Sequence, residues 1–232
     1  MIHLDATLDP DMTPAPLGLI VLQSDETLEL ELATDAPDLA RRSYVSRIPS
    51  AAEVSTDSLL AMKSELSRAA SLLPPQPLAA VGYGCTSASA VIGSEAVAEI
   101  IAASCQTKKV TNPLAATVAR AADLGISRLA LVSPYVEAVN QPLCAAFARH
   151  GLEMTPRGSF NIANEHAVTR ISIESIVRAA IRLGKDSNAE GVFLSCTNLR
   201  TLRAIPMIEE VIGKPVISSN SALFWHLRAL SH

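Results

Sequence analysis

The feature that most constrains the fold is an arrangement of segments that occurs twice, about 110 residues apart. Apolar runs at Leu17–Leu22 and Arg128–Val132 each have the pattern of a buried strand, and a second such strand follows each of them about sixty residues later. These second strands end in Gly84-Cys85-Thr86-Ser87 and in Ser195-Cys196-Thr197-Asn198. The matched Cys-Thr pairs favour two copies of one strand–helix unit over the alternative, a chance similarity among common α/β elements.

Helical patterns separate the predicted strands. Asn112 and Pro113 are typical of a helix start, with an N-cap and a proline in the first turn. Strands that alternate with helices predict an α/β fold in which helices cover both faces of a parallel sheet. Further strands are expected at Leu78–Tyr83, Glu153–Phe160, Gly191–Ser195 and Pro215–Ser218, and helices after Asp57 and at Ser89–Ser104, Val136–His150, Ser172–Leu183, Leu202–Ile212 and Ser221–Leu230.

The repeat also suggests how the chain divides. Residues 1–16 are rich in proline and acidic residues without periodicity, which predicts a loose N-terminal arm. We expect a first lobe over residues 17–112, with the Cys85 loop, and a second lobe over 113–219, with the Cys196 loop. The remaining residues, 220–232, are expected to form a helix that packs back on the first lobe.

Composition excludes several classes of protein. Of the 232 residues, 49% are hydrophobic and 18% are charged, which is typical of a folded protein with a large core. The net charge is −4 and no Lys/Arg cluster occurs, so we expect no nucleic-acid partner. The longest apolar runs have about six residues, far short of the length that spans a membrane.

The four cysteines are expected to be reduced. The N-terminal stretch lacks the apolar core of a secretory signal, which favours a cytoplasmic protein, and thiols stay reduced in that compartment. No two cysteines form a CxxC pair, so we expect no structural zinc. Cys105 and Cys144 lie within helical patterns and are predicted to be core residues.

Cys85 and Cys196 are the candidate catalytic residues. Ligands of open α/β sheets bind beyond the carboxyl ends of the strands, where both cysteines are predicted to lie. A helix start at that place lowers a thiol pKa, so we expect thiolate to be available near neutral pH. Two facing thiols suit acid/base or addition chemistry, and the hydroxyls of Thr86, Ser87 and Thr197, together with Asn198 and loop N–H groups, could bind a carboxylate or a developing anion.

Three segments carry a resemblance to known enzymes, namely Gly82-Tyr83-Gly84-Cys85-Thr86-Ser87, Ser195-Cys196-Thr197-Asn198-Leu199 and Gly213-Lys214-Pro215-Val216-Ile217-Ser218-Ser219-Asn220. They resemble the maleate isomerase and arylmalonate decarboxylase group of the aspartate/glutamate racemase superfamily. The resemblance covers Gly18 to Leu230. It implies two pseudo-symmetric Rossmann-like lobes, each a parallel sheet flanked by helices, with the active site in the cleft between them and no cofactor or metal.

The resemblance also assigns residues. Maleate isomerases carry both cysteines, as this chain does, whereas the decarboxylases keep only the one that corresponds to Cys196. Tyr135, in a matching Ser-Pro-Tyr-Val segment, and Asn164 are implied to bind substrate. The alternatives are a packed aromatic residue for Tyr135 and a turn residue for Asn164.

The first loop departs from the isomerase pattern. Asp25 stands in a Gln-Ser-Asp-Glu-Thr stretch where the isomerases carry Asn, and this stretch looks like the ectoine-utilisation branch, which is racemase-like. An ionised Asp25 would repel a carboxylate and would suit an ammonium or amide N–H of an amino or acylamino acid. Alternatively, Asp25 caps a helix over residues 27–32.

These observations predict a cofactor-independent isomerase or racemase that uses both cysteines on a small carboxylate-bearing substrate, an amino or acylamino acid or a maleate-type diacid. A decarboxylase of the arylmalonate type, with Cys196 acting alone, is the alternative, and a non-catalytic solute receptor is a third possibility. The family resemblance and the Ala-rich and Leu-rich helical surface favour a homodimer or a higher homo-oligomer.

Overall fold

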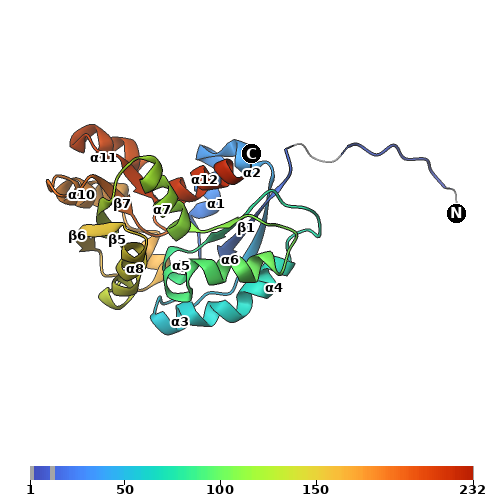
Figure 1. The fold of residues 1–232 in the computed structure, drawn as a ribbon, viewed down its shortest axis with the longest axis horizontal. Helices are drawn as coiled ribbons and strands as arrows, with labels where there is room; N and C mark the ends of the chain where they lie inside the picture. The colour runs from blue at the N-terminus through green and yellow to red at the C-terminus, as the bar shows by residue number, and fades with distance from the viewer. Residues whose placement is uncertain (1–2, 11–13, 232) are drawn as a thin grey trace.

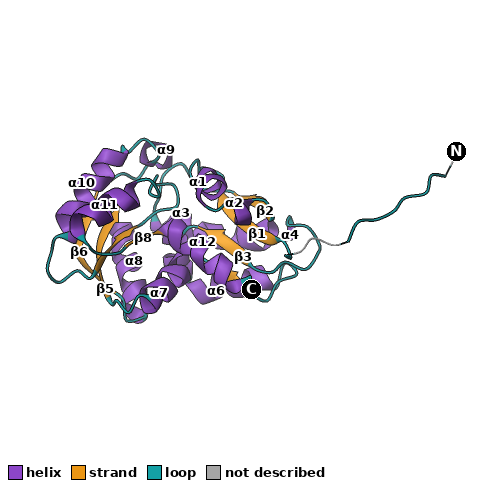
Figure 2. Cartoon of the chain, turned by 90° about the horizontal axis from the view of Figure 1, so that it is seen from above, coloured by secondary structure: helices purple, strands orange, loops and turns teal. Residues whose placement is uncertain are grey.

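The computed structural model describes residues 3–10 and 14–231, and two four-stranded sheets organise it. The first sheet has the order β2-β1-β3-β4 and the second has the equivalent order β6-β5-β7-β8. All neighbouring strands are parallel. Helices flank both sheets, so the molecule has two similar lobes (Figures 1 and 2). The prediction of an α/β fold with two similar halves is confirmed.

The elements of the two lobes follow one another in matching order. The first lobe contains β1 (Leu17–Leu22), α1 (Leu28–Asp35), α2 (Pro37–Ala40), β2 (Ser43–Ile48), α3 (Thr56–Ala61), the 3-10 helix η1 (Met62–Glu65), α4 (Leu66–Ser71), β3 (Val81–Gly84), α5 (Thr86–Ile92), α6 (Ser94–Ala102) and β4 (Val110–Thr111). Next come α7 (Pro113–Asp123), β5 (Arg128–Ser133), α8 (Glu137–Arg149), β6 (Glu153–Ser159), α9 (Glu165–Val168), α10 (Ile173–Gly184), β7 (Gly191–Leu194), α11 (Ala204–Ile212), β8 (Val216–Ser218) and α12 (Ser219–Leu230).

The sequence predicted the four central strands β1, β3, β5 and β7, and also the edge strands β6 and β8. Every residue of β1, β3 and β7 is buried, because each strand has a neighbour on both sides and helices on both faces. Strand β2 was not predicted. It pairs with β1 along its whole length but lies at the edge of the sheet and alternates buried and accessible residues, so it lacks a continuous apolar run.

Two predicted helix boundaries differ from the structure. A single helix was expected at Ser89–Ser104, but Gly93 adopts φ +97° and separates α5 from α6. Helix α3 is capped by Ser55 rather than Asp57, since the Ser55 hydroxyl accepts the N–H of Ser58 in a capping box. Gly213, at φ +64°, ends α11 as the sequence indicated.

Helix α12 links the lobes. It begins at the end of β8 in the second lobe and packs on the first, where Leu223, Phe224 and Leu227 share an apolar cluster with Leu17 and Leu19 of β1. The same helix contacts α7 extensively. Since β4 ends at residue 111 and α7 begins at 113, this contact lies near the proposed lobe boundary.

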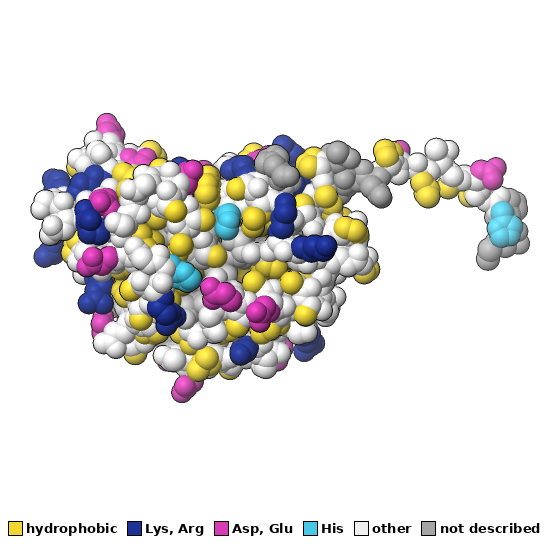
Figure 3. All heavy atoms as spheres, viewed as in Figure 1, with side chains coloured by type: hydrophobic (Ala, Val, Ile, Leu, Met, Phe, Trp, Pro, Cys, Tyr) yellow, Lys and Arg dark blue, Asp and Glu magenta, His cyan; other side chains and the backbone are white. Residues whose placement is uncertain are grey.

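The described part of the N-terminal arm contains neither helix nor strand. Residues 3–10 are exposed and extend away from the body (Figure 1), whereas Pro16 joins the sheet through its carbonyl, which accepts the N–H of Ala79 at 2.8 Å. The rest of the predicted arm lies outside the described residues. Along the described chain, no helix combines the length and apolar character needed to cross a bilayer. Side chains of both charges mix with apolar ones on the face in Figure 3.

Candidate active site

Cys85 directly follows strand β3 and begins helix α5. Its backbone is extended, and its Sγ accepts the N–H of Ala88 at 3.4 Å, so the thiol acts as the helix cap. The Ser87 hydroxyl lies 3.7 Å from the same sulfur. The residue is only 3% exposed. The thiol is therefore held in one position by the first turn of its own helix, within the interior of the protein.

Cys196 occupies the equivalent place after strand β7, and its backbone is strained. Its φ of +132° lies in a region that residues with a side chain rarely adopt. Its N–H donates to Ser219 Oγ at 3.0 Å, and the residue is 4% exposed. Such strain persists only where the surroundings hold it, and it concentrates at functional sites.

Two threonines tie the cysteine loops together across the lobe interface. Thr86 Oγ1, in the first lobe, donates to Ser219 Oγ at 2.7 Å. Thr197 Oγ1, in the second lobe, donates to the carbonyl of Gly84 at 3.2 Å. Each threonine thus reaches into the opposite lobe. The reciprocal pattern follows from the duplicated loops, and it holds Cys85 and Cys196 near each other although they are 111 positions apart in the sequence.

Tyr135 lies close to both thiols. It follows strand β5 and is 2% exposed, and a hydrogen bond joins its hydroxyl to the Cys196 thiol. Both thiols act electrostatically on it. Its loop is fixed because Asn140 Nδ2 donates to the Tyr135 carbonyl at 2.9 Å while Asn140 Oδ1 accepts from Ser133 Oγ at 2.7 Å. The structure therefore brings Cys85, Cys196 and Tyr135 to one place, from three different loops.

The environment keeps both thiols protonated at rest. Burial raises the pKa of Cys85 to about 12, against the opposing effect of the Ala88 N–H. Burial also raises the pKa of Cys196 well above its ordinary value, the Glu165 carboxyl raises it further, and the hydrogen bond with Tyr135 opposes the shift. The sequence-based expectation of a lowered thiol pKa is wrong for this structure, because the loss of hydration outweighs the helix N–H groups.

Asp25 both caps a helix and leaves one oxygen free. Its Oδ1 accepts the N–H groups of Thr27 and Leu28, each at 2.8 Å, as the helix-cap alternative expected. Its Oδ2 is buried without a hydrogen-bond partner among the described residues. Burial raises the pKa of Asp25, although the two N–H groups oppose this. Asp25 also acts on the pKa of both cysteines, so its carboxyl lies within the electrostatic reach of both thiols.

Glu165 is the site residue that sequence reasoning missed. It begins α9, is 7% exposed and raises the pKa of both thiols. Asn164, the residue implied by the family resemblance, is exposed instead, and its Oδ1 caps α9 by accepting the N–H of Ala167 at 2.9 Å. Burial and the effect on both thiol pKa values thus favour Glu165 as the residue of this segment that lies near the thiols, and substrate binding by Asn164 stays a prediction.

Asn198 holds three loops together. Its Oδ1 accepts the N–H of Glu26 at 2.8 Å, and its Nδ2 donates to Glu165 Oε2 at 3.0 Å and to the Ser24 carbonyl at 3.3 Å. It is fully buried. The Asn198 side chain, which the sequence analysis suggested for substrate binding, is thus used for contacts within the protein. The backbone N–H of Asn198 acts to lower the pKa of the Cys196 thiol.

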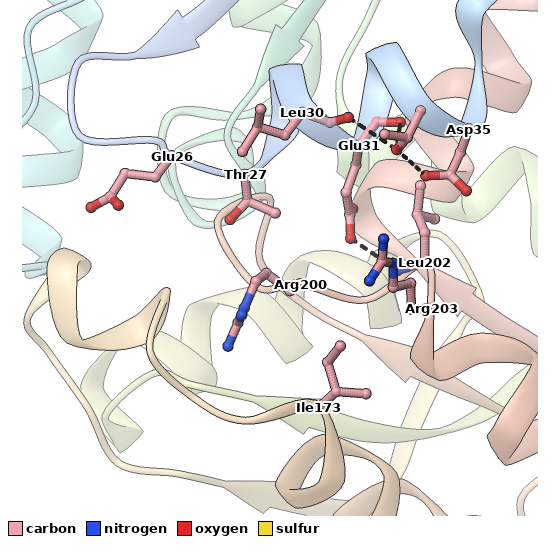
Figure 4. Close-up of a pocket in the computed structure, with 10 residues that line it drawn as sticks. Glu26, Thr27, Leu30, Glu31, Asp35, Ile173, Arg200, Leu202 and Arg203 are labelled. Carbon is pink, nitrogen blue, oxygen red and sulfur yellow. Dashed lines mark hydrogen bonds between the residues drawn. The ribbon is translucent and has the colours of Figure 1, made fainter.

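A surface groove of about 210 Å³ lies beside this buried cluster (Figure 4). Helix α1 forms one side and the segment that leads to α11 forms the other, with Thr27, Arg200 and Arg203 in its wall. Thr27 Oγ1 donates to the Asn198 carbonyl at 3.0 Å, which closes the interior end of the groove. Neither of the two candidate cysteines lines it. The groove is therefore separate from the two thiols.

Comparisons with known proteins agree with this geometry. A family model described as arylmalonate decarboxylase matches residues 32–232. Arylmalonate decarboxylase of Bordetella bronchiseptica is 37% identical over 103 residues, which make up 44% of this chain and 43% of that protein. Maleate isomerase of Geobacillus stearothermophilus is 26% identical over 231 residues, covering 93% of this chain and 91% of that protein.

Solved structures show the same fold. A double mutant of arylmalonate decarboxylase in the liganded form, 26% identical, superposes with a TM-score of 0.84 over 94% of this chain and 93% of its own. A Nocardia farcinica maleate cis-trans isomerase carrying a cysteine-to-serine change and a covalently bound succinylcysteine intermediate is 24% identical and has a TM-score of 0.81, with 93% of this chain and 92% of its own covered.

Proposed function

Because the chain belongs to the arylmalonate decarboxylase family, we propose that it is a cofactor-independent isomerase or racemase that uses Cys85 and Cys196 on a small carboxylate-bearing substrate. One observation carries the proposal: each thiol follows a central strand of its own lobe, and Thr86 and Thr197 bind the two loops together. A substrate held between them would present one face to each sulfur. Relatives named maleate isomerase extend over most of this chain, which supports isomerisation.

In the proposed reaction the two sulfurs exchange roles. One cysteine, as thiolate, removes the proton from the carbon beside the carboxylate, and the other, as thiol, delivers its proton to the opposite face. The substrate is inverted, and the enzyme ends with the proton on the other sulfur. For a substrate with a double bond, the thiolate adds to one carbon, rotation follows and the thiolate leaves again. Neither version needs an oxidant or a reductant.

The developing negative charge needs donors close to the sulfurs. Ser87 is suited to this task because its hydroxyl lies 3.7 Å from the Cys85 sulfur, and Tyr135 because its hydroxyl reaches Cys196. The Thr86 and Thr197 hydroxyls are used for the ties between the lobes, so we assign them a positioning role. Fixed donors of this kind stabilise charge without reorganisation.

Proton exchange at the substrate carbon tests the proposal. The protein is incubated in deuterated water with maleate and with enantiopure amino and N-acetylamino acids, and deuterium incorporation and loss of optical activity are followed. Cys85→Ser and Cys196→Ser are each expected to lower turnover by about 10³-fold with an unchanged melting temperature, because serine is similar in size but forms little anion near neutral pH. If a single variant keeps near-full activity, the two-cysteine scheme is wrong.

Decarboxylation is the second candidate, because the matching family model and one relative carry that activity in their names. In this scheme a malonate-type acid loses carbon dioxide and Cys196 alone protonates the resulting enolate. Bicarbonate release from a disubstituted malonate, retained in Cys85→Ser and lost in Cys196→Ser, would establish it in place of isomerisation.

We also propose that the enzyme acts in a reducing compartment such as the cytoplasm. Both cysteines must stay reduced to carry protons, and the thiols at the site are free in the structure. To test this requirement, free thiols are counted in protein taken from cells before and after lysis in air. Activity is measured on the same samples. Full activity after complete oxidation of both cysteines would contradict it.

A further inference from the structure

We propose that Asp25 and Glu165 act together as a carboxyl pair that selects substrates with a positively charged nitrogen beside the reacting carbon. The inference rests on the proposed function and narrows its substrate class. The pair comes from the two lobes: Asp25 follows β1 in the first, and Glu165 begins α9 in the second. Asn198 joins the two segments, because its side chain contacts the Ser24 carbonyl, the Glu26 N–H and Glu165 Oε2.

The carboxyls are built into the interior rather than exposed to solvent. Asp25 is 4% exposed and Glu165 is 7% exposed. Asp25 is fixed by the two N–H groups on its Oδ1, while its Oδ2 is buried and has no partner within the described ranges. Glu165 is fixed by Asn198, whose Nδ2 lies 3.0 Å from Oε2. A buried polar atom without a partner is costly, which points to a group that a bound molecule supplies.

Both carboxyls act on the reacting centre. Each raises the pKa of Cys85 and of Cys196, and Asp25 raises the pKa of Glu165, which burial has already shifted upward. The pair and the two thiols therefore form one electrostatic unit. A substrate carbon between the sulfurs would place its substituents close to these carboxyls.

Among the described residues, basic side chains contribute little to this group of carboxyls and thiols. Arg47 is the basic residue that acts on Asp25, but its side chain is 44% exposed and pairs with Glu29. In residues 3–10 and 14–231, no basic group acts on the pKa of Glu165. A ligand with an ammonium or amidinium group would favour the ionised form of these carboxyls and pair with it, whereas a dianion would oppose their ionisation.

A zwitterionic amino acid fits both the hydrogen-bond donors beside the thiols and the carboxyl pair. Its carboxylate can accept hydrogen bonds from the donors beside the thiols, such as Ser87, while its cationic nitrogen meets the carboxyl pair. An N-acetyl derivative keeps the carbon skeleton and the carboxylate but loses the charge on nitrogen, so it isolates the contribution of the pair.

Matched ligands and matched variants test the inference. Dissociation constants are measured by calorimetry for a series of amino acids, their N-acetyl derivatives and maleate, with the Cys85→Ser protein to prevent turnover. The amino acid that binds best is expected to bind at least tenfold more tightly than its N-acetyl derivative and than maleate. Glu165→Gln and Asp25→Asn, each introduced into the same protein, should reduce this preference at least tenfold. Glu174→Gln, an exposed acid on α10, serves as the control and should leave it unchanged.

The outcomes separate this inference from the proposed function. If the carboxamide variants keep the original preference, or if maleate binds best to the unaltered site, the inference is wrong while cysteine-dependent proton exchange can still hold. If no substrate shows cysteine-dependent exchange, the proposed function fails and binding alone decides the inference. Both substitutions preserve shape, and an unchanged circular dichroism spectrum confirms that each variant is folded.

Discussion

The buried thiols determine the pH dependence that we expect. A pKa of about 12 for Cys85 means that the thiolate is scarce near neutral pH and that its fraction rises about tenfold for each pH unit below that value. The rate kcat/KM should therefore increase with pH between 7 and 9.5 with a slope near one on logarithmic axes. A pH–rate profile with stability controls checks this. A plateau in kcat/KM below pH 8 would show that the thiol of the free enzyme titrates below that pH, which would contradict the effect of burial.

Glu165 should make the folded protein less stable as pH rises, whereas an acid in a surface ion pair makes it more stable. Its pKa is raised in the folded protein, mainly by burial, so the folded state keeps a proton that the unfolded chain releases. Its contribution to stability is thus lost as pH rises above the ordinary Glu range. Glu165→Gln keeps an acceptor for Asn198 and should stabilise the protein by about 1 kcal/mol at pH 8.

Thermal unfolding of the two proteins at pH 4.5 and pH 8 measures this difference. The gain should shrink at pH 4.5, where the carboxyl of the unfolded chain is itself about half protonated. An equal gain at both pH values would mean that packing, rather than the buried charge, is responsible.

Among the helices, α1 depends most visibly on a contact with the other lobe. Its Glu31 is 9% exposed, and Oε1 accepts the N–H groups of Thr201 at 2.6 Å and Leu202 at 2.9 Å. Its Oε2 accepts from Asn220 Nδ2 at 2.7 Å, on α12. One carboxylate thus joins α1 to the loop after Cys196 and to α12.

Removal of this carboxylate should be costly. Glu31→Ala leaves three donors without their partner, and we expect a loss of about 3 kcal/mol in the free energy of unfolding. Urea denaturation measures it. Glu29→Ala, on the exposed side of the same helix, is the control and should change stability by less than about 0.5 kcal/mol. Equal effects of the two substitutions would contradict the role given to Glu31.

At the scale of the whole molecule, we expect a homo-oligomer, most simply a dimer. Large apolar side chains remain on the surface of the single chain, including Leu30 and Leu72, each about two-thirds exposed, and Val211. Burial of such groups against a second copy would be favourable. Light scattering should give about twice the 24.5 kDa of one chain. A mass of one chain at micromolar concentration would refute this prediction.

The reacting groups of the proposed site are buried. Cys85, Cys196 and Tyr135 are each less than 5% exposed. The contact from Thr27 to the Asn198 carbonyl joins the lobes close to them. We therefore expect the surrounding loops to move when a substrate binds, and closure around the substrate would position the reacting carbon.

The sequence by itself determined the repeating order of strands and helices and the positions of the two cysteine loops. Central strands such as β1 and β7 are buried on both faces, so nearly all of their consecutive residues are apolar and the strands can be recognised from the sequence. The loops follow because a residue after a central parallel strand lies at the ligand-binding edge of the sheet, whatever the rest of the chain contains.

Only the tertiary structure decided what surrounds each side chain. Asn164 and Glu165 are adjacent in sequence, yet one caps a helix at the surface and the other is buried beside the thiols. The thiol pKa values depend on burial by segments from both lobes, and the edge strand β2 is recognised by its pairing with β1 rather than by its own residues. Hydration and hydrogen-bond partners come from residues far along the chain, and local patterns carry no information about them.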